Sequence, residues 1–575
     1  MKTKSSISNR RQKTPGSEAS SGAPKSLSPV AFSVTAAALA AAVFAVYSPA
    51  LNFQFILDDH HFVGDPRLQS AGHIWEYFSN YVWAQVAGGP SSFYRPLFVL
   101  WLRLNFILSE MSPWGWHFLS IVKHVSAAIL LGLLIWRLLR NRVAALMAGT
   151  LFALHPAQTE SVAWVTVPDP LMSAAVLGSV LLYLRYEDNT SADSQHPGRK
   201  SGRAARKITR SRPSVAWLIA SAAVCLAALL TKETAIVLPA VFFGLALTKD
   251  VEPGGVGGGL GNRLLRAFRE ILPFLGATAV YLLLRLQVLG QLGAQTQHLA
   301  WSTVLLSWPA TLWFYVKVLL WPVRLRAFSD SSQTDTLSLD GVLLPGLAVV
   351  GVATILAWAL HWAWRKARRD LPEREAVGVK QALVLGTLIL VLPILLALNL
   401  NALNPEDFLH GRYTYLPLTG LLLLLATGWH LAGKKQTMLL LAAGFLAIVS
   451  AVLTVKQEAA WKDDLTIFTV AHEVAPHNAP VSLSLARAHV QVALDLDQAG
   501  RCNEAVPLLQ QVTREYPQDW FAWAGLGDCF LQLNDLPGAE ESLHRAAELS
   551  HEPRVTEQWQ EVRAKMGKLS SALPK

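Results

Sequence analysis

Long apolar runs, separated by short polar connections, fill most of the chain between residues 30 and 455. The hydrocarbon core of a bilayer, about 30 Å thick, takes roughly 20 apolar residues of helix. The runs expected to form helices are 30–50, 116–139, 143–153, 171–186, 215–230, 236–247, 271–289, 342–360, 382–398, 413–429 and 438–455. The pattern therefore predicts an all-α protein, a polytopic membrane helix bundle with about 11 transmembrane helices.

Two further apolar runs fit a membrane span less well. The run 94–108 is short for a membrane span and carries Arg95 and Arg103, so this helix is expected to enter or skirt the outer leaflet. Residues 303–320 lie between two polar flanks that both fall on the outer side. That placement predicts a re-entrant or interfacial segment, which is permitted when it is buried in protein.

Lysine and arginine mark every second connection between the runs, namely residues 137–142, 199–212, 249–270, 365–369 and 434–435. Because such connections stay in the cytoplasm, the basic, Ser- and Pro-rich residues 1–29 are expected to be a disordered cytoplasmic tail. The first apolar helix then acts as an uncleaved anchor. The chain emerges outside at Leu51 and again after Lys456, so the membrane domain covers residues 30–455.

From residue 456 the apolar runs give way to amphipathic helices with a repeat. The positions that fit the tetratricopeptide spacing are Trp523, Leu526, Gly527, Phe530, Ala539, Leu543 and Ala546. A looser copy precedes them, with Ala505, Leu509, Val512 and Pro517, and a half-copy has Phe468, Ala471 and Pro476. Residues 456–575 are therefore expected to form a small α-solenoid of two to three repeats outside the cytoplasm.

Composition agrees with a membrane protein, since 52% of the residues are hydrophobic and only 16% are charged, whereas soluble proteins carry about 25%. The net charge of +10 comes from the basic connections, so it reflects topology, and nucleic acid is excluded as a partner. Cys225, Cys502 and Cys529 make no disulfide framework, although a bridge between the last two remains an alternative. The glycines of 254–261 match no phosphate-binding loop and predict a flexible linker.

The predicted topology gathers acids and bases on the outer face. This arrangement suits the transfer of a sugar from a lipid phosphate, because cations hold the phosphate and a carboxylate takes the proton of the acceptor hydroxyl. Asp58 and Asp59 are assigned the catalytic role, and Arg95, Lys232 and Arg412 the donor phosphate. The supporting residues are His155, Glu160, Asp169 and Glu233, and the outer face also includes His60, His61, Arg324, Arg326, Asp407 and His410.

Each assignment has a structural alternative. An Asp-Asp pair can cap a helix, and Arg95 and Arg412 can extend to lipid headgroups. Lys232 and Glu233 can form an interfacial ion pair, and Asp169 between two prolines can mark a turn. The metal question stays undecided: no cofactor is assigned, and His60 and His61 could bind a divalent metal with Asp58, but no further ligand has diagnostic spacing.

A series of short motifs runs through the chain in a fixed order. They are Phe55-Ile56-Leu57-Asp58-Asp59, Phe93-Tyr94-Arg95-Pro96-Leu97, Leu104-Asn105, Trp114, His117, His124, Phe152-Ala153-Leu154-His155-Pro156, Thr159-Glu160-Ser161-Val162-Ala163, Lys232-Glu233 and Arg412-Tyr413-Thr414-Tyr415-Leu416-Pro417. In this order they resemble the transmembrane and tetratricopeptide-repeat O-mannosyltransferases of the glycosyltransferase C superfamily.

The resemblance implies an outward-facing site, a polyprenyl-phosphate-linked sugar donor, inversion at the anomeric carbon, and a catalytic role for Asp58 or Asp59. It also implies a re-entrant connection near Thr303. The chain departs from the family pattern at Thr166-Val167-Pro168-Asp169, where relatives usually have Gly-Arg-Lys/Ala-Asp. The acid is kept and the basic residue before it is absent.

The leading hypothesis is an integral-membrane glycosyltransferase that moves a mannose-like hexose from a polyprenyl phosphate to a protein or glycan hydroxyl. Its partners are the lipid-linked sugar, the acceptor and membrane lipid. A non-catalytic membrane scaffold whose repeats bind partner proteins is the alternative. A transporter is less favoured because ionisable residues gather at the ends of the spans, with Lys123 and His124 as exceptions. The expected location is a bacterial inner membrane with the repeats in the periplasm.

Overall fold

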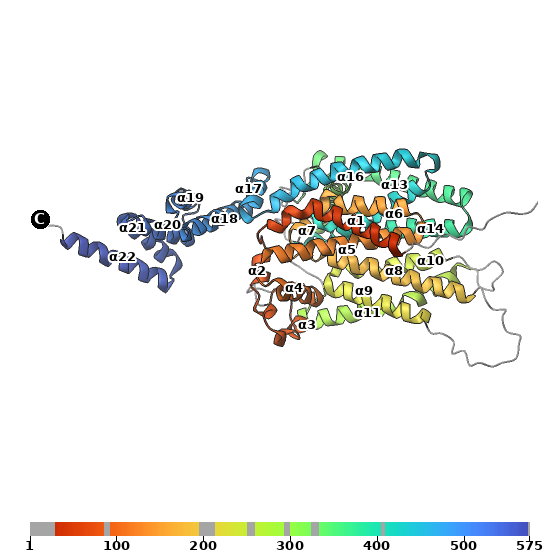
Figure 1. Cartoon of the computed structure of the whole chain (residues 1–575), viewed down its shortest axis with the longest axis horizontal. Helices are drawn as coiled ribbons and strands as arrows, with labels where there is room; N and C mark the ends of the chain where they lie inside the picture. Colours follow the sequence, from red (N-terminus) through yellow and green to blue (C-terminus); the bar gives the residue numbers. More distant parts are fainter. Residues whose placement is uncertain are drawn as a thin grey trace, which may run out of the picture.

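The computed structural model describes residues 29–84, 93–194, 213–249, 259–292, 299–323, 333–403 and 409–572. Within these ranges the chain is helical and contains no strand. Figure 1 shows a bundle of long helices lying roughly side by side, from which a narrower row of helices, α17 to α22, projects at one end. The all-α prediction is confirmed.

The long helices of the bundle coincide with the apolar runs, although some extend by two to three turns beyond them. They are α1 (Pro29–Tyr47), α4 (Pro96–Ser109), α5 (Pro113–Leu139), α6 (Arg142–Leu154), α8 (Asp169–Ser194), α9 (Pro213–Thr231), α10 (Leu238–Thr248), α11 (Leu260–Leu289), α12 (Trp301–Leu320), α13 (Leu344–Asp370), α14 (Glu373–Leu396), α15 (Tyr415–His430) and α16 (Gln436–Glu458).

Short helices build the connections. They are η1 (Ser48–Asn52), α2 (Asp59–Val63), η2 (Pro66–Leu68), η3 (Ala71–His73), α3 (Glu76–Ser79), η4 (Pro156–Gln158), α7 (Thr159–Ala163), η5 (Glu233–Val237), η6 (Leu339–Leu343), η7 (Leu400–Ala402), η8 (Gly411–Thr414), η9 (Gly433–Lys435) and η10 (Ala459–Trp461).

Local sequence explains where several long helices begin and end. Pro96 and Pro113 stand at the first position of α4 and α5, where a missing N–H costs no helical hydrogen bond. Asn141 caps α6, since its side chain accepts a hydrogen bond of 3.0 Å from the Ala144 N–H. Gly290, at φ +68°, ends α11 in the left-handed conformation that favours glycine.

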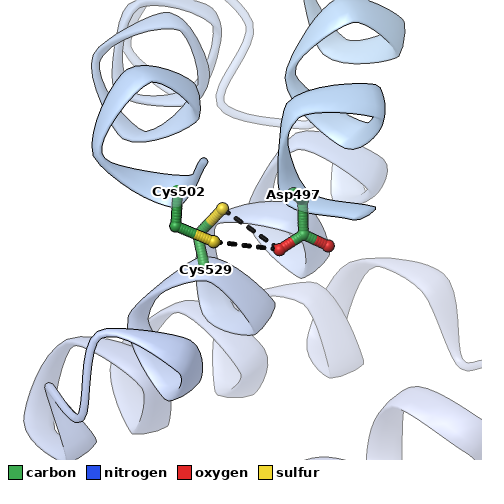
Figure 2. A group of neighbouring side chains, drawn as sticks. All are labelled: Asp497, Cys502 and Cys529. Atoms are coloured by element: carbon green, nitrogen blue, oxygen red, sulfur yellow. Dashed lines mark hydrogen bonds between the residues drawn. The ribbon is translucent and has the colours of Figure 1, made fainter. Parts of the chain in front are cut away.

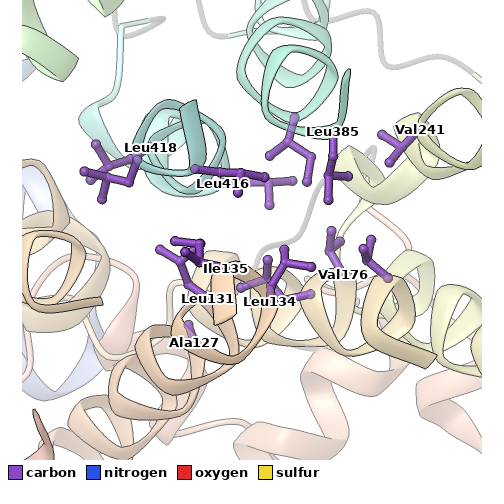
Figure 3. Close-up of a cluster of buried hydrophobic side chains, with 14 of the residues drawn as sticks. Ala127, Leu131, Leu134, Ile135, Val176, Val241, Leu385, Leu416 and Leu418 are labelled. Atoms are coloured by element: carbon purple, nitrogen blue, oxygen red, sulfur yellow. The ribbon is translucent and has the colours of Figure 1, made fainter. Parts of the chain in front are cut away.

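The bundle has one large apolar core. Figure 3 shows buried side chains of α5, such as Leu131 and Leu134, facing Leu385 of α14 and Leu416 of α15. Helices α14 and α15 approach closely at Gly420, where a Cβ would lie 2.5 Å from the Gly386 carbonyl oxygen. Small residues of this kind let helix backbones pack together in membranes.

The outward faces of the bundle are apolar, as expected for a multi-pass membrane protein. Leu347 of α13 and Leu441 of α16 are 70% and 71% exposed. Among the described residues, seven helices are long and apolar enough to cross a bilayer, and four apolar helices are shorter. The figure of about 11 spans therefore stays a prediction. Helix α12, expected to be re-entrant, is 20 residues long and is one of the seven.

Charged groups mark both ends of the bundle. Asp169 begins α8 and Asp188 lies 19 residues later, which at 1.5 Å per residue separates them by roughly 28 Å. Arg137 at the end of α5 pairs with Asp188, and Lys249 follows directly after α10. Both cations belong to the basic connections of the chain. The basic connection 199–212 and the tail before residue 29 lie outside the described residues, as do Arg324, Arg326 and Asp407.

Six antiparallel helices follow the bundle: α17 (Asp464–Val474), α18 (Ala479–Gln498), α19 (Cys502–Glu515), α20 (Trp520–Gln532), α21 (Leu536–Ser550) and α22 (Pro553–Ala572). The tetratricopeptide spacing predicted from residues 523–546 falls on α20 and α21. Gly527 lets these two helices meet, because a Cβ there would lie 2.6 Å from Leu543 Cγ. The predicted repeats are thus paired helices in the structure.

Candidate active site at one end of the bundle

A cavity of about 490 Å³ lies beside α2 and α4. Six of the nine residues predicted for the site line it: Asp58, Arg95, Asp169, Lys232, Glu233 and Arg412. Aromatic side chains, among them Trp83, Phe93, Trp164, Tyr281 and Tyr413, line it as well. The fold therefore brings together groups that the sequence scatters over five separate parts of the chain.

The two adjacent aspartates have different surroundings. Asp59 is fully buried, and its carboxylate accepts hydrogen bonds from the Thr166 N–H (3.1 Å), the Thr166 hydroxyl (2.7 Å) and the Ile56 N–H (3.3 Å). Burial raises the pKa of Asp59 to about 7, and the bonds from Thr166 and Ile56 oppose that rise. Asp58 is partly exposed and lines the cavity. Asp59 is thus placed to hold the loop, and Asp58 to meet a bound molecule.

The surroundings of Asp58 also affect its protonation. Burial raises the pKa of the Asp58 carboxyl, while the charges of Arg412 and His61 act in the opposite direction. A raised pKa makes a carboxylate a stronger proton acceptor. Asp58 is therefore suited to receive a proton from a hydroxyl group in the cavity.

Each of the three predicted cations of the cavity is paired with a carboxylate from another part of the chain, whereas Arg285, which also lines the cavity, donates to a backbone carbonyl oxygen and to a tyrosine hydroxyl. Lys232 Nζ lies 2.7 Å and 2.6 Å from the two Asp169 oxygens, and both side chains are about 5% exposed or less. Arg95 donates to both oxygens of Glu233, at 2.9 Å and 2.6 Å. These contacts connect the starts of α4, α8 and η5 around the cavity.

The third pair involves Glu160, which does not line the cavity. Its carboxylate accepts hydrogen bonds of 3.0 Å from both the backbone N–H and the Nη1 of Arg412, and it lies 3.5 Å from His410 Nδ1. Burial raises the pKa of Glu160, and the charge of Arg412 lowers it. Glu160 thus holds Arg412 from outside the cavity, and the Arg412 guanidinium lies over the Trp164 ring, 4.7 Å from its centroid.

His155, the last of the predicted residues, lies away from the cavity. Its Nδ1 accepts a hydrogen bond of 3.2 Å from the Ala157 N–H and so caps η4. Burial lowers its pKa to about 4, so the imidazole is neutral. Its position fits a structural role in the turn that leads to Glu160.

Two residues that the sequence analysis did not place in the site support it. Thr166 holds Asp59, and Lys123 of α5 donates to the carbonyl oxygens of Val165 (3.1 Å) and Val167 (3.3 Å). Thr166 belongs to the segment that departs from the family pattern, and Lys123 is a cation inside an apolar helix. Both irregularities were visible in the sequence, but only the fold shows that they meet at residues 165–167.

The metal site that the sequence left open as an alternative would need ligand atoms of His60, His61 and Asp58 close together, and these three residues do not form such a group in the structure. His60 Nε2 lies 2.8 Å from Asp464 Oδ2, and His61 contacts the Trp83 ring. Among the described residues, the group with metal-ligating atoms close together is Asp497, Cys502 and Cys529 in the repeats (Figure 2). Both thiols are free and approach Asp497 Oδ1, at 3.1 Å and 3.3 Å. Burial raises the pKa of both thiols, which keeps them protonated as donors to this carboxylate.

The cavity combines the groups needed to bind a phosphate and to deprotonate a hydroxyl. Glu233 engages Nε and Nη2 of Arg95. A guanidinium carries five N–H donors in a planar fork, so one edge can pair with a carboxylate while another meets a phosphate. The carboxylates also balance the cations, so the site avoids burying unpaired positive charge.

Comparison with known proteins gives one match to the repeats and others that cover most of the chain. A tetratricopeptide-repeat family model matches residues 492–552. The chain is 28% identical to the protein O-mannosyl-transferase Tmtc1 of Drosophila melanogaster, covering 77% of this chain and 58% of the relative. It is 26% identical to human TMTC1, covering 86% and 56%, and 24% identical to mouse TMTC3, covering 88% and 54%.

A solved structure of the archaeal oligosaccharyltransferase AglB from Archaeoglobus fulgidus aligns with 79% of this chain and 59% of that chain, at 12% identity and a TM-score of 0.41. The chain spans a little over half the length of the curated relatives it matches. The predicted resemblance is confirmed: over most of its length, the chain is similar to the protein O-mannosyl-transferases that its motifs indicated.

Proposed function

We propose that the chain is an integral-membrane glycosyltransferase that transfers a mannose-like hexose from a polyprenyl phosphate to a hydroxyl of a protein or glycan. The observation that carries this proposal is the cavity that Asp58 lines together with three cations, Arg95, Lys232 and Arg412, each of them paired with a carboxylate. The relatives named as protein O-mannosyl-transferases support the sugar and the acceptor. The apolar outer faces of the bundle support a donor held at the lipid boundary.

In the proposed reaction the acceptor oxygen attacks the anomeric carbon, and Asp58 takes the proton of the hydroxyl. The bond between the anomeric carbon and the phosphate oxygen breaks, and the polyprenyl phosphate leaves with that electron pair. Arg95, Lys232 and Arg412 stabilise the charge that develops on the phosphate. A single displacement of this kind inverts the anomeric configuration. Asp59 acts as a positioning residue, because its carboxylate is held by Thr166.

We further propose that residues 30–455 form the catalytic membrane domain and residues 456–575 the repeat domain, preceded by a cytoplasmic tail. The tail and the basic connections lie in the cytoplasm, and the cavity and repeats face the periplasm of a bacterial inner membrane. The charge pattern of the connections supports this orientation. Cysteine labelling of single-cysteine variants at position 58 tests it, since reagents confined to the periplasm should then react there.

The activity is tested with purified protein, a polyprenyl-phosphate hexose and an acceptor mixture, with the anomeric form of the product read by NMR. The wild-type protein and a Glu76→Gln variant should transfer the sugar with inversion, because Glu76 lies outside the cavity and pairs with His73. No transfer from any polyprenyl-phosphate hexose would contradict the proposal. Mass spectrometry of periplasmic glycoproteins, with and without the gene, identifies the acceptor.

The match of residues 492–552 to a repeat that commonly binds peptides favours a second function, a membrane-anchored scaffold. That function predicts that partner proteins bind the repeats whether or not Asp58 is intact. Pull-down with wild-type and Asp58→Asn proteins, alongside the transfer assay, separates the two: a scaffold keeps its partners and transfers no sugar.

A further inference from the structure

Helix α17, the first helix beyond the bundle, contacts the loop that carries Asp58. Asp464 of α17 accepts a hydrogen bond of 3.0 Å from the Leu57 N–H through Oδ1, and its Oδ2 lies 2.8 Å from His60 Nε2. Just before α17, the Lys462 carbonyl oxygen accepts a bond of 2.9 Å from the Gln54 N–H. One carboxylate therefore holds the loop on both sides of Asp58.

The backbone at Leu57 makes the first of these contacts important. Leu57 has a φ of +52°, in the left-handed region that a leucine rarely adopts. Such a conformation persists only where surrounding contacts stabilise it. The bond from Leu57 N–H to Asp464 is such a contact, and the next residue along the chain is Asp58.

Apolar packing strengthens the same junction. Trp461 and Ile467, at the start of the projecting helices, share a buried cluster with Phe53 and Ile56 of the Asp58 loop. Trp461 also stacks on Trp164, with ring centroids 6.2 Å apart. Trp461, at the end of η10, thus contacts a residue that lines the cavity, Trp164, while α17 contacts the loop that carries another, Asp58.

We infer that Asp464 is a positioning residue for Asp58, so that the helical region after the bundle contributes to the site. The inference rests on the proposed function. It assigns to α17 a task distinct from partner binding: α17 keeps the Leu57–His60 segment in the conformation that points Asp58 into the cavity. Figure 1 shows α17 at the end of the bundle that carries α2.

The test compares Asp464→Ala, which removes both contacts, with Asp464→Asn, which keeps an acceptor oxygen for Leu57 but loses the charge opposite His60. Asp519→Ala is the matched control, because Asp519 caps α20 within the repeats and contacts no part of the cavity. We expect Asp464→Ala to lower kcat on the order of 10²-fold, as for a misplaced catalytic group. The donor KM should change little, Asp464→Asn should be milder, and Asp519→Ala should match the wild type.

Hydrogen exchange of the Leu57 amide gives a readout that does not depend on activity. Exchange at Leu57 should be faster in Asp464→Ala and unchanged in Asp519→Ala. A wild-type kcat in Asp464→Ala, or equal losses in Asp464→Ala and Asp519→Ala, would overturn the inference. If the wild-type protein transfers no sugar, the proposed function fails. The hydrogen exchange of the Leu57 amide then tests by itself whether α17 holds the loop. An exchange rate in Asp464→Ala equal to that of the wild type would reject this contact.

Discussion

The two ends of the bundle contain the same kinds of charged groups in different settings. At one end, Lys232–Asp169 and Arg95–Glu233 line a cavity of about 490 Å³. At the other end, Lys249 Nζ lies 2.5 Å from Glu270 and 3.3 Å from Glu187. No residue of this second cluster lines the cavity.

Neighbouring side chains donate further hydrogen bonds to the carboxylates of the second cluster. The Tyr183 hydroxyl donates to Glu270 (2.8 Å), and the Gln381 amide donates to Glu187 (2.8 Å). These bonds join α8, α11 and α14, so the cluster connects helices, and both of its carboxylates have partners within it. Ion pairs between helices are thus not evidence of a site by themselves. What distinguishes the first end is that a partly exposed carboxylate, Asp58, shares a cavity with the pairs.

Replacing Asp58 should have the largest effect of the changes that test this contrast. Asp58→Asn removes the proposed base, so transfer should fall by about 10²- to 10⁴-fold, while the melting temperature in detergent stays near that of the wild type. Glu187→Gln at the other end should keep transfer and lower the melting temperature. Equal loss of activity in both variants would remove the distinction between the ends.

Breaking the buried pair at Lys232 should affect both activity and stability. Lys232→Ala leaves Asp169 charged and unpaired in a site where it is about 4% exposed, a situation that costs about 3–5 kcal/mol. Lys232→Ala combined with Asp169→Ala should recover much of the stability without recovering transfer, because the phosphate loses a cation in both variants. Denaturation and transfer assays on the four members of this cycle measure the difference.

Asp59 predicts a dependence of stability on pH. Since burial raises its pKa from 3.8 to about 7, the folded protein keeps a proton that the unfolded chain releases between these values. Stability should therefore fall as the pH rises from about 4 to 7 and level off above that, with an upper limit on the order of 4 kcal/mol for a shift of this size. Melting temperatures across this range should show a flatter profile for Asp59→Asn, in which the group cannot titrate.

The smallest effect is expected at the second cluster, around Lys249. Lys249→Ala leaves Glu187 and Glu270 with the bonds from Gln381 and Tyr183, so the loss should be about 1–3 kcal/mol. Transfer measured well below the melting temperature should match the wild type. A fall in kcat would show that the second cluster affects the cavity and would weaken the contrast between the two ends.

Periodicity and length located most of this fold in advance. The apolar runs predicted where the long helices lie, because a segment that must bury its backbone polar groups in lipid has few alternatives to a helix, but α8, α11, α13 and α14 extend about 8 to 11 residues beyond their runs. The spacing of residues 523–546 predicted the helix pair α20 and α21 in the same way. Charge pattern and motif order also selected the candidate site residues, six of which line one cavity.

The sequence by itself determined which segments are helices and which ionisable residues are candidates for the chemistry. Only the tertiary structure decided that Asp58 faces the cavity while Asp59 is held by Thr166, and that Arg95, Lys232 and Arg412 are each matched with a carboxylate. It also decided that Asp464, 407 positions after Leu57, holds the loop. Helical periods report on neighbours a few residues apart, whereas contacts between distant connections depend on how all the helices pack.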